Sequence, residues 1–381
     1  MNQFYLPTQI VAGEGSLALL GSHARSFGSR ALVVCGKRFL RGSGHLNKIQ
    51  QSLAESGVSY TIFDEVTPDP TAAIVERGIA AARTFQTDVV IGIGGGSAMD
   101  VAKAVASAAN ESLSIEELID QGLSRKGLPC ICIPTTSGTG SEVTGISVLT
   151  IPAAQRKTAL RGVHNFPNVA IIDPVLTYSL PPQLTAITGV DALTHAIEAY
   201  LSARATAFSD AVAERAIQMI GNSLLTVFAN PSDRQARSDM AMASCLAGIA
   251  ISQAGTGGAH GIGMSLGGLF NVPHGMAVGS VLPHILRFNA RCCQKKLSRI
   301  ATLLGHASSD HTADGATAAI KIIVDLLEKL ELPTSLAHLG LSPSDQERLL
   351  EDTLSQKAWA TNPRTASRQD VQTLISELVR D

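Results

Sequence analysis

From Met240 to Leu286 the chain contains no Asp, Glu, Lys or Arg. A run this long without a charge has to be buried, either in a bilayer or inside a large folded domain. A membrane span needs about 20 predominantly apolar residues in one run. This stretch is instead interrupted by many Gly, by Ser, Gln, Asn and Pro, and by three His. We therefore predict helices buried in the middle of a soluble domain.

The composition supports a large globular protein. A chain of 381 residues suits two domains, and a hydrophobic content of 45% can fill their cores. The net charge is −2 and no basic stripe is present, so neither nucleic acid nor a membrane surface is an expected partner. The first residues lack the features of a secretory signal, and six scattered cysteines without a CxxC pair fit a reducing cytoplasm.

Short β-branched runs alternate with amphipathic stretches in the first half of the chain. The alternation predicts strands at Ala31–Val34, Ser59–Asp64, Asp88–Gly94, 129–136, 146–151 and 169–174, and helices at 45–57, 70–85 and 97–109. The run at Asp88–Gly94 is continuously apolar, as in a strand buried on both faces. Strands that alternate with helices indicate a parallel sheet flanked by helices.

The pattern changes near Tyr178–Gln183, after which the β-type runs end. Helical periodicity and length then predict helices at 182–202, 209–229 and 233–252, and again at 368–380. We therefore predict an α/β domain over residues 1–180 and an all-α domain over residues 181–381.

A glycine triplet, Gly94–Gly96 in "IGIGGGSAMDVAK", follows a predicted buried strand and opens a helix. Glycine lets the backbone approach a ligand closely, and a helix N-terminus attracts phosphate. Ser97 suits a helix cap that also reaches a phosphate oxygen. A plain tight turn is the alternative, but it needs fewer glycines. We favour a pyrophosphate-binding loop, although the motif is not the GxGxxG fingerprint.

A second loop, "PTTSGTGSEVT", gathers hydroxyl groups and glycines after another predicted strand, at Thr135, Thr136, Ser137, Gly138 and Thr139. Open α/β sheets bind ligands at the carboxyl ends of their strands. The two loops are therefore expected to form two walls of one cofactor site.

Four side chains of the predicted helical domain suggest a metal site. Asp191 and His195 are four residues apart on one predicted helix and so share a face. His260 and His274 then need only come from neighbouring helices. Three imidazoles and a carboxylate suit Fe(II) or Zn(II). Each histidine alone could equally be a hydrogen-bonded core residue. We expect His284, the nearest rival, at a helix start away from the site.

Several ordered motifs together resemble the iron-containing (group III) alcohol dehydrogenase family. They are "GIGGGSAMDVAK", "PTTSGTGSE", "DPVLTYSLPP", "GVDALTHAIEAY" and "VPHGMAVGSVLPHILRFN", and the likeness extends over essentially the whole chain. The resemblance implies the dehydroquinate synthase-like fold of that family, with the active site in the interdomain cleft. It also implies a cytoplasmic homodimer or larger homo-oligomer. The implied activity is that of a metal-dependent, NAD(P)-linked oxidoreductase interconverting a small alcohol and its aldehyde or ketone.

The resemblance carries over residue by residue. The family's metal ligands fall on Asp191, His195, His260 and His274, with Fe(II) expected and Zn(II) compatible. Its cofactor contacts fall on Gly36, Asp69, Gly94, Gly95, Gly96, Ser97, Thr135, Thr136, Gly138, Thr139 and Lys157. Within that set, the family pattern puts Lys157 beside the nicotinamide ribose and Asp69 near the adenosine end.

Two positions depart from the usual family pattern. Gly36 stands where many members have an Asp that binds the ribose 2′-hydroxyl, and Lys37 and Arg38 follow it. The absent carboxylate and the two cations favour NADP(H), although both could be plain surface charges, and NAD(H) stays open.

Met264 stands where the family commonly has a histidine beside the nicotinamide. A thioether carries no titratable proton. The proton would need another route, through cofactor hydroxyls, a water chain or a threonine, for which Thr144 is the candidate. Met264, together with Ile251 at a position often occupied by an aromatic residue, predicts an apolar and roomier substrate pocket.

Two other readings compete with the metal-dependent dehydrogenase. One is a metal-free reductase of the same superfamily, similar to the maleylacetate reductases. The other is a catalytically inactive nucleotide-binding subunit. Retention of all four presumed ligands argues against both.

Overall fold

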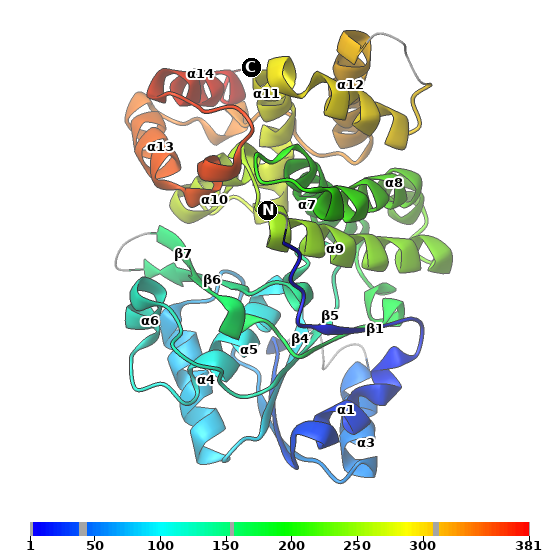
Figure 1. Cartoon of the computed structure of the whole chain (residues 1–381), viewed down its shortest axis with the longest axis vertical. Coiled ribbons are helices and arrows are strands. Elements are labelled where there is room, and N and C mark those ends of the chain that lie inside the picture. The colour runs from blue at the N-terminus through cyan, green and yellow to red at the C-terminus, as the bar shows by residue number, and fades with distance from the viewer. Residues whose placement is uncertain (1–2, 38–43, 153–155, 308–311, 381) are drawn as a thin grey trace. The chain divides into compact units, whose positions relative to one another are not determined.

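The computed structural model describes residues 3–37, 44–152, 156–307 and 312–380. The chain divides into two compact units. We call Leu6–Leu180 the α/β unit, and Pro181–Asp381 together with Met1–Tyr5 the helical unit. Figure 1 shows their elements, coloured along the chain. Within the described residues, no helix is both long enough and apolar enough to cross a bilayer.

The α/β unit contains a six-stranded, fully parallel sheet with the order β1-β8-β5-β4-β2-β3. Its strands are β1 (Gln9–Ala12), β2 (Arg30–Val34), β3 (Ser59–Phe63), β4 (Val89–Gly94), β5 (Cys130–Pro134) and β8 (Val169–Ile172). Every residue of β4 and β5 is buried, which explains their continuous apolar sequence. Of the six strands of this sheet, β1 is the one that the sequence did not predict.

Helices cover both faces of this sheet (Figure 1), namely α1 (Leu20–Phe27), α3 (His45–Glu55), α4 (Ala72–Thr84), α5 (Gly96–Ala108) and α6 (Ile115–Gln121). The side chains of β2 alternate between two apolar cores. Leu32 and Val34 pack with α4 and α5, whereas Ala31 and Val33 pack with α1 and α3. The predicted fold class, a parallel sheet flanked by helices with a helical C-terminal part, is confirmed.

The strand predicted at 146–151 exists, but its predicted place in the parallel sheet was wrong. β6 (Ile146–Ile151) pairs antiparallel with β7 (Arg156–Arg161) in a separate two-stranded sheet. Buried residues alternate with half-buried ones along β6, so the strand has only one face against the core. A strand of a doubly covered parallel sheet would be buried on both faces.

The helical unit contains α7 (Pro182–Leu201), α8 (Ala207–Ala229), α9 (Arg234–Ala254), α10 (Gly258–Phe270), α11 (His274–Leu303), α12 (Thr312–Lys329), α13 (Pro343–Ser355) and α14 (Arg368–Leu378) around one apolar core. Every residue of α7 from Gly189 to Leu201 is buried, so this helix lies at the centre of the unit. The uncharged stretch supplies the second half of α9, all of α10 and the start of α11. His284 lies inside α11, directly after Pro283, so its predicted place at a helix start was wrong.

Candidate metal and cofactor sites

The central helix α7 presents Asp191 and His195 one turn apart on the same face. Their side chains are 4% and 7% exposed, and Asp191 Oδ1 lies 3.9 Å from His195 Nδ1. The buried position follows from the sequence around them, because "GVDALTHAIEAY" consists mainly of small and apolar residues and contains no Lys or Arg. Both chemically active side chains are therefore held rigidly inside the unit.

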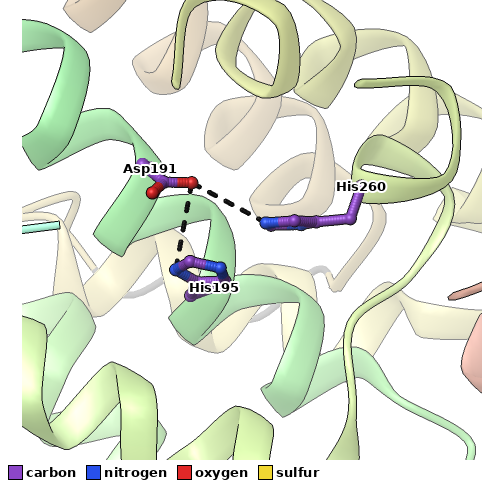
Figure 2. A group of neighbouring side chains, drawn as sticks. All are labelled: Asp191, His195 and His260. Carbon is purple, nitrogen blue, oxygen red and sulfur yellow. Dashed lines mark ion pairs between the residues drawn. The ribbon is translucent and has the colours of Figure 1, made fainter. Parts of the chain in front are cut away.

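Two further imidazoles reach the same carboxylate from α10 and α11. His260 Nε2 lies 3.7 Å from Asp191 Oδ1, and His274 Nε2 lies 3.6 Å from the same oxygen. Figure 2 shows Asp191, His195 and His260 pointing toward one another. Asn271, in the left-handed conformation, ends α10, and α11 begins at His274. This tight connection brings the second histidine back to the carboxylate that the first one faces.

The geometry of the cluster fits a metal ion better than a set of hydrogen bonds. Distances of 3.6–3.9 Å exceed hydrogen-bond length. Ligand atoms around a tetrahedral ion at 2.0–2.2 Å lie about 3.3–3.6 Å apart. Among the described residues, Asp191 Oδ1 and His260 Nε2 are buried without a hydrogen-bond partner. The donor atoms of Asp191, His195 and His260 all lie within 4.8 Å of one another, and His274 extends the group through Asp191.

The electrostatics also suit a cation. Burial would raise the pKa of Asp191, but His195, His274 and His260 outweigh it and hold that pKa well below its usual range. Burial lowers the pKa of His195 to about 4, so this imidazole is neutral. Burial would also lower the pKa of His260, but the carboxylates of Glu198 and Asp191 raise it to about 9. A cation bound here would displace that proton.

Sequence reasoning missed Glu198, which follows His195 on the same face of α7. Its side chain is 3% exposed, and its Oε2 lies 2.6 Å from His260 Nδ1. The spacing of Asp191, His195 and Glu198, at i, i+4 and i+7, was the available signal.

The predicted phosphate loop lies at the end of β4, beside the second loop. Gly94 pairs in register with Pro134 of β5, so both loops leave the sheet at the same edge. A Cβ atom at Gly96 would lie 2.8 Å from Thr139 Cγ2, which means that the loops touch where glycine leaves room. The structure thus brings together Gly94, Gly95 and Gly96 with Thr135, Thr136, Gly138 and Thr139.

The predicted capping role of Ser97 was wrong. Helix α5 begins at Gly96, so its N-cap is Gly95, and no side chain caps it. Ser97 is instead the second residue of the helix and is half-buried. The glycine at the N-cap takes an extended conformation, so the helix starts two residues earlier than a cap at Ser97 would place it.

Two predicted cofactor residues contact each other directly. Lys157 Nζ lies 2.6 Å from Asp69 Oδ1, with the lysine side chain 5% exposed and the aspartate side chain 55% exposed. A pair this close cannot mark opposite ends of an extended dinucleotide. The expected placements, Lys157 at the nicotinamide ribose and Asp69 at the adenosine end, therefore cannot both hold.

Thr144 lies in the interior of the α/β unit. It is 4% exposed, accepts a hydrogen bond from Lys103 at 3.3 Å and donates one to the Ser141 carbonyl at 3.4 Å. A hydroxyl engaged in this way holds the fold together. Its surroundings give no support to the proton-transfer role for which it was a candidate.

The two departures from the family pattern lie in different units. Gly36 follows β2 and forms a backbone bridge with Glu65, whose side chain pairs with Arg77 at 2.8 Å. Lys37 is exposed, and Arg38 lies outside the described residues. In the helical unit, Met264 is half-buried on α10, one turn after His260, and Ile251 is buried on α9.

Both halves of the chain match models of one family. Residues 7–174 match the model described as iron-containing alcohol dehydrogenase. Residues 185–379 match the model described as the C-terminal part of the Fe-containing alcohol dehydrogenase family.

Proteins similar to this chain over most of its length are named as alcohol dehydrogenases. The chain is 38% identical over 350 residues to long-chain-alcohol dehydrogenase 1 of Geobacillus thermodenitrificans, covering 91% of this chain and 88% of the relative. It is 38% identical over 388 residues to 1-propanol dehydrogenase PduQ of Salmonella typhimurium, covering 100% of both. It is 33% identical over 379 residues to the NAD-dependent methanol dehydrogenase of Bacillus methanolicus, covering 98% of this chain and 99% of the relative.

Solved structures show the same fold. That of a 1,3-propanediol oxidoreductase superposes with a TM-score of 0.95 at 35% identity, covering 99% of this chain and 100% of the other. That of sulfoacetaldehyde reductase from Bifidobacterium kashiwanohense in complex with NAD⁺ superposes with a TM-score of 0.91 at 30% identity, covering 100% and 99%. The predicted reaction class, NAD(P)-linked interconversion of an alcohol and its carbonyl compound, is confirmed. The chain belongs to the iron-containing alcohol dehydrogenase family.

Proposed function

We propose that Asp191, His195, His260 and His274 hold a divalent iron ion, with zinc as the alternative ion. The observation that carries this proposal is the convergence of three imidazoles on Asp191 Oδ1, a buried oxygen without a hydrogen-bond partner among the described residues. An ion held there supplies a Lewis acid for the substrate oxygen. The four side chains provide one carboxylate and three nitrogen ligands, which both iron and zinc accept.

The α/β unit is the proposed binding site for the nicotinamide dinucleotide, which supplies the hydride. The amides at the start of α5 and the hydroxyls of the second loop suit its pyrophosphate. Lys157 is a buried cation held against Asp69, so it can present a fixed positive charge to a ribose or phosphate oxygen.

The preference for NAD(H) or NADP(H) is proposed to depend on the side chains around the 2′ position of the adenosine ribose. Gly36 offers no carboxylate there, and Lys37 beside it is exposed. We therefore propose that NADP(H) is accepted and favoured, whereas two relatives are named for NAD or were solved with it. The ratio of kcat/KM for NADPH and NADH tests this, and a preference for NADH would refute it.

The substrate is proposed to be a small, largely apolar alcohol or its carbonyl compound. Met264 is an apolar side chain on α10, one turn after His260, and Ile251 is an apolar side chain on the preceding helix, α9. Because Met264 cannot take a proton, we assign proton transfer to cofactor hydroxyls or ordered water. The family relatives named above act, by their names, on propanol, methanol, propanediol and long-chain alcohols.

The decisive experiment combines metal analysis with turnover. Purified protein is expected to contain about one iron or zinc ion per chain and to lose aldehyde reduction after chelation, with recovery on adding Fe²⁺ or Zn²⁺. Activity that survives complete metal removal would favour a metal-free reductase. Tight binding of NAD(P)H without turnover of any aldehyde in a panel of short aldehydes would favour an inactive nucleotide-binding subunit.

A further inference from the structure

The centre of the helical unit contains a third acidic or imidazole side chain on the same face of α7. Glu198 follows Asp191 and His195 by one further turn and is buried. Its two oxygens make two different bonds of 2.6 Å. Oε2 meets His260 Nδ1, and Oε1 accepts from the amide of Ala259. Neither the ligand set nor the cofactor set above includes this residue.

We propose that Glu198 is the positioning residue of the metal site, acting on the metal through His260. This inference rests on the proposed metal site. A carboxylate at 2.6 Å from Nδ1 keeps the proton on that nitrogen when the imidazole is neutral. Nε2 then carries the free lone pair, and it is Nε2 that faces Asp191 Oδ1 at 3.7 Å. Glu198 thus selects the tautomer and the ring orientation that a metal ligand requires.

The second oxygen fixes the helix that carries His260. Helix α10 begins at Gly258 behind Gly257, and neither glycine has a side chain to cap it. The caps come from elsewhere: Asn362 Oδ1 accepts from the Gly258 amide at 3.2 Å, and Glu198 Oε1 accepts from the Ala259 amide. Glu198 therefore sets the helix start and the ring together, whereas Asn362, whose side chain also pairs with Asn289, bonds the helix start but not the ring.

The charges of the cluster lead to the same conclusion. Among the described residues, the ion pairs of Asp191 and Glu198 involve only the imidazoles of His195, His260 and His274. Two buried carboxylates without a permanent cation are costly. A divalent cation among neutral imidazoles would balance both charges. Glu198 thereby contributes to the affinity for the ion without touching it.

Glu198→Gln keeps the size of the side chain but cannot keep both its bond to His260 Nδ1 and its bond to the Ala259 amide. An amide oxygen turned toward the Ala259 amide puts the NH₂ group against Nδ1, which moves the imidazole proton to Nε2, where the ion must bind. The opposite orientation keeps the His260 bond but sets the NH₂ group against the Ala259 amide. Either way, one of the two bonds is lost.

The test titrates metal-free protein with Co²⁺ and with Zn²⁺, and records the visible spectrum of the Co²⁺ form. We expect Glu198→Gln to weaken both metals by 10- to 100-fold and to change the Co²⁺ spectrum. Asn362→Ala is the matched control, since it removes a cap of α10 but not the bond to His260. It is expected to lower the melting temperature while keeping metal affinity and spectrum.

Wild-type Co²⁺ affinity and spectrum in folded Glu198→Gln would overturn the proposal, as would an equal loss of affinity in Asn362→Ala. Glu198→Asp, which keeps the charge but is too short to make both bonds, is the second variant if Glu198→Gln does not fold. It is expected to weaken Co²⁺ binding, and unchanged binding would again overturn the proposal. Asp191→Ala separates a failure of the Glu198 proposal from a failure of the metal site. If this variant retains the metal, the metal site itself is misplaced and the proposed function fails.

Discussion

Lys103 Nζ lies 3.1 Å from Asp100 Oδ1, one turn away on α5, and the lysine side chain is only 1% exposed. The same ammonium group donates to the carbonyls of Ser141, Thr144 and Ile146. Asp100 in turn accepts from Ser141 Oγ at 2.5 Å and from the Val148 amide at 2.9 Å. The helix that begins at the glycine loop is thus tied to the segment that follows the hydroxyl loop, so both loops are held by one buried pair.

Lys103→Met should therefore be strongly destabilising. It leaves Asp100 buried without its cation and takes a donor away from the carbonyls of Thr144 and Ile146, whereas the Ser141 carbonyl keeps its bonds from Thr144. Breaking a buried pair costs about 3–5 kcal/mol. The free energy of unfolding, measured by urea denaturation, checks this value. The double variant Asp100→Asn, Lys103→Met is the control. It should lose less than the two single variants summed, because the second change removes the charge that the first one stranded.

The buried carboxyl group of Glu142, on the short 3₁₀ turn Ser141–Val143, should make the stability of the fold depend on pH. It is 1% exposed, its Oε1 has no hydrogen-bond partner among the described residues, and burial raises its pKa from 4.5 to about 7, although Lys103 opposes the shift. Between pH 4.5 and 7 the unfolded chain has released this proton and the folded chain has kept it. The free energy of unfolding therefore falls as the pH rises through this window.

Glu142→Gln removes that titration and nothing else of similar size. Relative to the wild type, the variant should gain stability between pH 4.5 and 7, by an amount on the order of 3 kcal/mol at most. Urea denaturation at pH 4.5, 6 and 8 measures the difference, in which the titrations of all other groups cancel. A difference that stays constant across these three pH values would show that Glu142 is ionised in the folded protein.

Gly95 and Gly96 offer a matched pair for the phosphate loop. A Cβ at Gly96 would lie 2.8 Å from Thr139 Cγ2, whereas one at Gly95 would lie 3.6 Å from Thr136 Oγ1, an ordinary contact. Gly96→Ala should cost about 1–3 kcal/mol of stability. Gly95→Ala should cost less than about 1 kcal/mol. If the pyrophosphate approaches the backbone here, Gly95→Ala should nevertheless weaken NAD(P)H binding at least 10-fold. Fluorescence titration with NADPH and NADH measures this, and wild-type affinity would place the pyrophosphate elsewhere.

The parts of the fold that sequence could predict are those with a single strong signal. β4 and β5 are buried on both faces, so their runs are continuously apolar, and α7 to α9 are long and periodic. β1 reads "QIVA" and has no buried residue, and β7 reads "RKTALR", so neither shows the continuous apolar run of β4 or β5. β6 has the sequence of a strand, but that sequence does not reveal its partner, which is β7, the next strand along the chain, rather than a strand of the main sheet.

The candidate site likewise has residues that could be predicted from the sequence and residues that could not. His260 and His274 stand out because residues 240–286 contain no Asp, Glu, Lys or Arg, and Asp191 and His195 stand out by their spacing of four. The spacing of Glu198 places it on the same face as Asp191 and His195, but its role was overlooked because its bonds to Ala259 and His260 depend on the packing of α7 against the start of α10. Ser97 was misjudged because the position of an N-cap depends on the backbone conformation, and it is Gly95, not Ser97, that takes the extended conformation in front of the helix.

Met264→His tests how the proton leaves the substrate. Met264 lies one turn after His260 on α10 and is half-buried, so an imidazole can replace the thioether without being placed in the core. The variant should fold and keep its affinity for NAD(P)H. With a pKa near 6.5, the new imidazole would accept a proton when neutral, so kcat/KM for alcohol oxidation should gain a limb that rises through about pH 6.5 and then levels off. Met264→Gln is the matched control, because it adds hydrogen-bonding capacity without a titratable group and should show no such limb. If the pH–rate profiles of wild type, Met264→His and Met264→Gln coincide, the side chain at position 264 takes no part in proton transfer, and the water or cofactor-hydroxyl route operates whatever residue stands there.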